Sequence, residues 1–127
     1  MNLVDSSAWL EYFSGGMAAK HFEPPLQDTA SLLVPSIVIY EVFKVVMRES
    51  GEKKALQALA ALQKGMVVEV TSRIAIAAAK SSLQHNLPMA DSIILATAHA
   101  YSATIWTQDA DFKHLPDVKY FPKKQKS

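Results

Sequence analysis

The apolar residues of this chain fall into short runs that are separated by longer segments with helical spacing. Several of these runs are apolar throughout instead of alternating with polar residues, which is typical of strands buried on both faces of a sheet. The runs that predict strands are residues 2–4, 31–35, 66–70, 103–107 and 118–121.

The segments between these runs have the pattern of amphipathic helices. Cap residues precede several of them, and "GG" at 15–16 and "SGE" at 50–52 interrupt the pattern. The two segments on either side of residues 50–52 predict an αα-hairpin. The segments that predict helices are 5–13, 17–28, 37–49, 53–64, 71–86 and 87–100, with a turn or short helix at 109–115.

Strands that alternate with helices predict a parallel sheet that is covered on both faces. We therefore expect an α/β fold, with three α/β/α layers around a central parallel sheet. No internal repeat or linker divides the chain, and 127 residues are enough to bury one core. We expect a single domain over residues 1–127.

The composition excludes several kinds of chemistry. The absence of cysteine excludes disulfides, thiolate metal sites and a cysteine nucleophile. The four histidines have no metal-ligand spacing, and the four glycines form no phosphate-binding loop. The apolar stretch at 32–40 contains a proline and is shorter than the roughly 18 residues of a membrane span. Since the N-terminus also lacks a signal-peptide pattern, we expect a cytoplasmic protein with no membrane association.

The charge is nearly balanced, with a net value of +1. Such a balance gives a nucleic acid little overall attraction, so a nucleic-acid substrate must be recognised locally. The tail at 121–127 carries three lysines. These lysines are either solvated or in contact with a polyanion.

Acidic residues follow two of the predicted strands. Asp5 follows the first strand, and Asp109 and Asp111 follow the strand at 103–107. Because the carboxyl ends of parallel strands meet at one edge of the sheet, these acids are expected to share that edge. Each also has a purely local interpretation, since Asp5 can cap the next helix and the two later acids suit a turn.

Two further acids lie on predicted helices. On a helix, Glu41 has Ile37, Val38 and Val45 among its neighbours, so its face is largely apolar, and an unpaired buried carboxylate is costly. Glu41 either pairs with Lys44 or joins the other acids around a cation. Asp91 lies in the first turn of its helix, where a carboxylate also satisfies free backbone amides and the helix dipole.

Four acids brought to one edge would repel one another and raise each other's pKa. A hard divalent cation relieves this repulsion, and Mg²⁺ or Mn²⁺ prefers oxygen ligands with several retained waters. Such ions activate water and stabilise charge on a phosphoryl group. The acids therefore suggest hydrolysis of a phosphodiester.

Four stretches in order resemble the successive motifs of PIN-domain ribonucleases, and most closely the VapC-like toxins of toxin–antitoxin systems. They are "VDSSAWLEYF", "IYEVFKVV", "ADSIILATA" and "TQDADFKHLP". The resemblance implies that Asp5, Glu41, Asp91 and Asp109 are the catalytic, metal-binding acids, and that Ser7 and Thr107 are hydroxyl residues beside them. Asp111 is the alternative for the last acid, although Asp109 lies nearer the strand end. Gln108 occupies a variable position where a basic residue is common in the family.

The resemblance also implies a function and partners. It predicts a Mg²⁺-dependent endoribonuclease, with Mn²⁺ able to substitute, that acts on RNA, forms a homodimer and binds a cognate antitoxin. The alternative is a non-catalytic PIN-like module that binds RNA or an antitoxin. A phosphatase of the haloacid-dehalogenase type is disfavoured because it needs a second acid two residues after the strand-end aspartate, where this chain has Ser7.

Overall fold

A computed structural model describes residues 1–123 and shows five strands, which form one sheet, and eight helical elements. The strands are β1 (Asn2–Val4), β2 (Leu32–Pro35), β3 (Met66–Val68), β4 (Thr104–Thr107) and β5 (Val118–Tyr120). The α-helices are α1 (Ser6–Ser14), α2 (Ala19–Gln27), α3 (Ser36–Ser50), α4 (Glu52–Leu62), α5 (Ser72–His85) and α6 (Met89–Ala100). Short 3₁₀ turns are η1 (Thr29–Ser31) and η2 (Ala110–Phe112).

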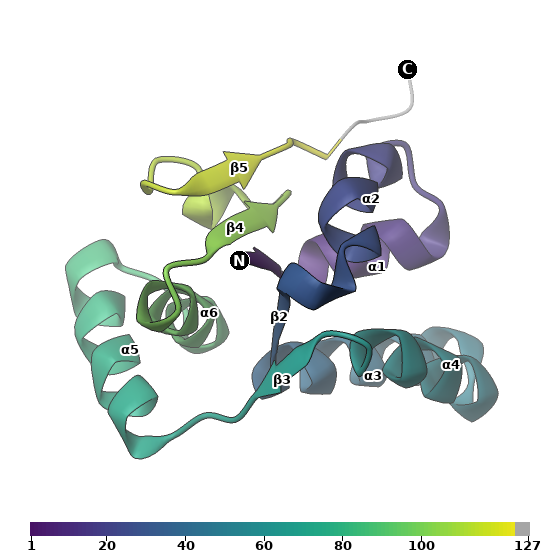
Figure 1. Ribbon diagram of the computed structural model, residues 1–127, viewed down its shortest axis with the longest axis horizontal. Coiled ribbons are helices and arrows are strands. Elements are labelled where there is room, and N and C mark those ends of the chain that lie inside the picture. The colour runs from purple at the N-terminus through teal and green to yellow at the C-terminus, as the bar shows by residue number, and fades with distance from the viewer. Residues whose placement is uncertain (124–127) are drawn as a thin grey trace.

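All strand pairs are parallel, in the order β3-β2-β1-β4-β5. Helices α1 and α2 lie on one side of the strands, and α5 and α6 lie on the other (Figure 1). The predicted fold class, three layers around a central parallel sheet, is therefore confirmed. Helices α3 and α4 pack together around Gly51, whose positive φ of 87° suits glycine, and they form the predicted αα-hairpin.

The strand order reverses direction at β1, since the chain passes outward to β2 and β3 and then returns to β4 on the other side. Ligands of open parallel sheets bind outside the carboxyl ends of the strands at such a switch point. Here the switch point lies between the end of β1 and the end of β4, which are paired neighbours. The topology therefore marks one place on the molecule for a ligand.

The central strands are apolar because both of their faces are covered. Leu3, Val4, Leu33 and Val34 are completely buried, which explains why these runs do not alternate with polar residues. None of the helices formed by residues 1–123 is long and apolar enough to cross a membrane.

Two local predictions need correction. The strand expected at 66–70 ends at Val68, and Ser31, expected in a strand, belongs to a 3₁₀ turn just before β2. The helix predicted at 17–28 forms as α2, which runs through Pro24 and Pro25, because buried Phe22 and Leu26 hold its apolar face on the core while the prolines give up two backbone hydrogen bonds. Of the three lysines in the tail at 121–127, only Lys123 lies within the described residues.

Candidate acidic metal site

Asp5 lies at the switch point, directly after β1, and caps α1. Its Oδ1 accepts hydrogen bonds from the backbone N–H of Ala8 (3.0 Å) and the hydroxyl of Ser7 (2.8 Å). Its Oδ2 accepts one from the hydroxyl of Thr107 at 2.6 Å. Asp5 is only 2% exposed, so this carboxylate is held rigidly at the floor of the site.

Thr107, the last residue of β4, connects Asp5 to the next acid. Its hydroxyl donates to Asp5 and accepts a hydrogen bond from the backbone N–H of Asp109 at 2.8 Å. Because Thr107 is fully buried, one hydroxyl fixes the ends of two neighbouring strands relative to each other. The predicted hydroxyl positions, Ser7 and Thr107, thus both contact Asp5.

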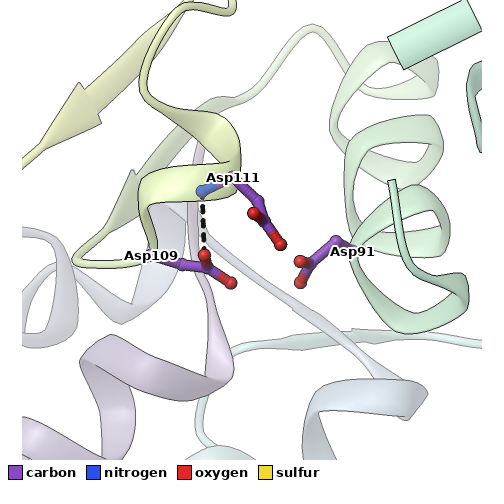
Figure 2. Close-up of side chains that lie close together, drawn as sticks. All are labelled: Asp91, Asp109 and Asp111. Carbon is purple, nitrogen blue, oxygen red and sulfur yellow. Dashed lines mark hydrogen bonds between the residues drawn. The ribbon is translucent and has the colours of Figure 1, made fainter. Parts of the chain in front are cut away.

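Asp91, Asp109 and Asp111 form a cluster above this floor. One carboxylate oxygen of each residue lies within 4.8 Å of the corresponding oxygens of the other two. Asp109 caps η2 by accepting a hydrogen bond from the backbone N–H of Asp111 at 2.9 Å. Figure 2 shows Asp91 reaching from α6 toward the two acids that follow β4. Both candidates for the last acid therefore belong to the cluster.

The electrostatics of the cluster favour a bound cation. The pKa of Asp91 is raised to about 8, first by burial and then by the negative charge of Asp109 and by hydrogen bonds and charge from its two neighbours. The pKa of Asp5 is raised to about 6, chiefly by burial, although its hydrogen bonds act in the opposite direction. These two carboxyl groups therefore ionise less readily than usual, and a cation bound beside them would favour their ionised form.

Glu41 lies in α3 and approaches the site from the β2 side. It is half-buried, and its Oε1 accepts a hydrogen bond from the hydroxyl of Ser6 at 2.6 Å. Within residues 1–123 no salt bridge joins it to Lys44, whose amino group lies 5.5 Å from the centre of the Tyr40 ring instead. The pairing considered from the sequence is therefore absent. Glu41 is tied to the N-terminus of α1, next to Asp5, and is not part of the three-acid cluster.

The donors present fit a hard divalent cation. The clustered groups are all carboxylates, the ligand type that Mg²⁺ and Mn²⁺ prefer. Two oxygens bound to one octahedral Mg²⁺ at about 2.1 Å lie about 3.0 Å apart when adjacent and about 4.2 Å apart when opposite. The three carboxylate oxygens, which lie within 4.8 Å of one another, would therefore have to move closer together to share one ion.

Two residues near the acids make contacts that the sequence did not predict. Ser6 contacts Glu41, but a serine after a strand-end aspartate is indistinguishable from an ordinary cap residue. Gln108 donates from its side-chain amide to the Ser7 carbonyl at 3.4 Å, and its Oε1 is buried with no hydrogen-bond partner among the described residues. The sequence identified Gln108 only as a variable position where the family often has a basic residue.

A parallel α/β sheet with clustered acids at its switch point defines the structural class. A family model, the PIN domain, matches residues 3–118. The chain belongs to the PIN domain family, and the resemblance found in its sequence motifs is confirmed. No curated protein matches the chain in sequence.

Solved structures share the fold over nearly the whole chain. A chain of a toxin–antitoxin complex from Klebsiella pneumoniae is 24% identical, with a TM-score of 0.80, and the match covers 94% of this chain and 96% of that one. VapC20 of Mycobacterium tuberculosis, described as a sarcin-ricin loop cleaving toxin, is 17% identical, with a TM-score of 0.77 and coverage of 91% and 95%. A chain of DNA-bound VapBC from Salmonella typhimurium is 13% identical, with a TM-score of 0.73 and coverage of 98% and 100%. At these identities the likeness concerns the fold.

Proposed function

We propose that this protein is the toxin of a type II toxin–antitoxin pair and a Mg²⁺-dependent endoribonuclease. The observation that carries the proposal is the cluster of Asp91, Asp109 and Asp111 at the switch point of a PIN-family sheet. Mn²⁺, which has similar ligand preferences, would substitute. We propose that the protein acts in the cytoplasm.

In this proposal the chain's own residues hold and position the reactants. The clustered acids would bind the ion, with Asp5 and Glu41 contributing directly or through water. Thr107 and Ser7 hold the Asp5 carboxylate in place through their hydroxyls. A bound Mg²⁺ would neutralise charge on the scissile phosphate and favour in-line attack by water, which leaves a 5′-phosphate and a 3′-hydroxyl.

The comparisons support the biological setting. Several structural neighbours are toxin–antitoxin assemblies, including VapBC2 from Rickettsia felis, and one is a toxin described as cleaving the sarcin-ricin loop. An antitoxin that masks an acidic site would suit this chain for the same reason that a cation does, since both supply positive charge. We infer a cognate antitoxin as the protein partner.

Cleavage of RNA tests the proposed function. Purified protein is expected to cut a mixed pool of single-stranded RNA in Mg²⁺ and to be inactive in EDTA. Glu41→Gln is expected to lower the rate, whereas Glu23→Gln, a change at an exposed glutamate of α2, serves as the matched control. RNA that stays intact in Mg²⁺ and in Mn²⁺ would favour the non-catalytic binding module, and equal rates with and without EDTA would contradict metal dependence.

We also propose that the protein forms a homodimer through α5. Ile76 is 61% exposed and Leu83 is 89% exposed, and their spacing of seven residues places both on one face of the helix. Ala79 lies between them on the same outer face. An apolar helix face of this kind is stabilised by contact with its equivalent on a second copy.

Leu83→Glu is expected to convert the dimer to a monomer, because it places a charge at the centre of a buried apolar contact. Light scattering after gel filtration measures this directly: the wild type should have twice the chain mass of 14.0 kDa, and the variant should have that mass once. Leu56→Glu, at a leucine of α4 that is 51% exposed, should leave the dimer intact. A monomeric wild type would contradict the proposal.

A further inference from the structure

A groove of about 690 Å³ runs beside the acidic site, between α1 and the hairpin of α3 and α4. Its apolar wall consists of Leu10 and Phe13 from α1 and Val45 and Val46 from α3. Polar side chains from the same helices and from the end of β4 complete the lining. None of the four apolar residues of this wall belongs to the acidic site.

One end of the groove is continuous with the acidic site. Ser7, which donates to Asp5, and Gln108, which lies between Thr107 and Asp109, both line the groove. The backbone N–H of Gln108 also approaches the Ser7 hydroxyl, at 3.4 Å. A chain molecule cut at the acids would therefore have a direct path along α1.

Two lysines line the groove. Lys54 comes from the first turn of α4, and Lys123 is the last residue that the structure describes, three positions after β5. Neither lysine forms a salt bridge within residues 1–123. Both ammonium groups could therefore pair with phosphates of a phosphodiester backbone in the groove.

The two acids that line the groove each have a partner within the protein. Glu11 is 8% exposed, and its Oε2 accepts a hydrogen bond from the backbone N–H of Ala18 at 2.9 Å. Glu49 lies 3.5 Å from the guanidinium of Arg48. These partners reduce the repulsion that either carboxylate would exert on a phosphate.

Gln108 points to a ligand that also carries hydrogen-bond donors. A buried acceptor without a partner is rare in folded proteins and is costly to leave unpaired. Ionised phosphate oxygens cannot donate to it, whereas a ribose hydroxyl or a base N–H can.

We propose that this groove holds single-stranded RNA on one side of the bond that is cut, with Lys54 and Lys123 on its phosphates and the apolar wall against its bases. The proposal rests on the proposed function, since it names the path of that enzyme's substrate. Bases stack and pack on apolar and aromatic surfaces without sequence preference, which suits a wall that includes Phe13.

The test measures binding rather than cleavage. A fluorescein-labelled single-stranded RNA of mixed sequence is titrated with full-length protein carrying Asp91→Asn, so that RNA remains intact during the titration. The affinity is followed by anisotropy over a series of salt concentrations. Lys54→Gln and Lys123→Gln are compared with Lys53→Gln, which removes the same charge from the neighbouring exposed position of α4 but outside the groove.

Each groove substitution is expected to weaken binding and to reduce the slope of log K against log salt by about 0.7, the value for one phosphate contact on a single strand. Lys53→Gln should leave this slope unchanged. Equal effects of Lys53→Gln and Lys54→Gln, or no effect of either groove substitution, would overturn the proposal. The groove would then be assigned to a peptide segment of a protein partner instead of RNA. Groove-dependent binding without cleavage by the wild type would refute the proposed catalysis while supporting the groove.

Discussion

Asp91→Asn is expected to abolish RNA cleavage and, at the same time, to raise the thermal stability of the metal-free protein. The activity should fall by at least about 100-fold, the upper end of the cost of losing an outer partner of a metal site. The stability should rise because the pKa of Asp91 is raised to about 8, so above pH 4 the folded chain pays to keep this carboxyl protonated or to ionise it beside Asp109. Asparagine cannot ionise and removes that cost.

Opposite signs for activity and stability separate a metal ligand from a structural residue. Loss of a structural residue would lower both. The matched control is Asp28→Asn, at an exposed aspartate between α2 and η1 that makes no side-chain cap hydrogen bond at the start of η1. It should change neither quantity. Cleavage by Asp91→Asn at the wild-type rate, or a lower melting temperature in EDTA, would contradict the role assigned to Asp91.

Raising the pH of the metal-free protein is expected to lower its stability, and Mg²⁺ is expected to reverse the loss. The folded-state pKa values of Asp5 and Asp91, about 6 and about 8, both exceed the ordinary value of 3.8. The folded chain therefore binds more protons than the unfolded chain between about pH 4 and pH 8. Over this window the free energy of unfolding falls as the pH rises. The stability that proton binding by these two carboxyl groups contributes is fully present only below about pH 4.

Ion binding needs the ionised carboxylates, so the affinity for Mg²⁺ should increase over the same window. Melting curves in EDTA and in excess Mg²⁺ measure both effects, because an ion that binds only the folded state raises the melting temperature. The gain from Mg²⁺ should be larger at pH 8 than at pH 5 and should largely disappear in Asp91→Asn. A melting temperature in EDTA that rises steadily from pH 5 to pH 8 would contradict the assigned electrostatics.

The elements and the edge that carries the acids could be predicted from the sequence because they follow from short-range rules. Short, continuous apolar runs such as 32–34 that alternate with helical segments are typical of buried parallel strands, and parallel strands bring their carboxyl ends together. Asp5 and Asp109 were therefore placed correctly at one edge. Each of these aspartates also has a local structural role, since Asp5 caps α1 and Asp109 caps η2. The same backbone geometry that satisfies a helix end also aims a carboxylate at the site.

The other features of the site depend on how the helices and strands pack, which the periodicity of the sequence does not encode. The sequence favoured Asp109 over Asp111 because of its distance from the strand, yet the tight turn of η2 brings both carboxylates to Asp91. The Ser6 contact of Glu41 depends on how α1 and α3 meet, which no spacing within either helix reveals. The groove, likewise, exists only once α4 folds back on α3 and the segment after β5 brings Lys123 to its lining.

A crystal soaked in Mn²⁺ tests directly whether these acids bind a divalent cation, through the anomalous scattering of the ion. We expect a peak between Asp91, Asp109 and Asp111, with oxygen ligands from at least two of them and with Asp5 facing the same ion directly or through water. Crystals that bind Mn²⁺ elsewhere on the molecule, while the three carboxylates remain apart, would contradict it.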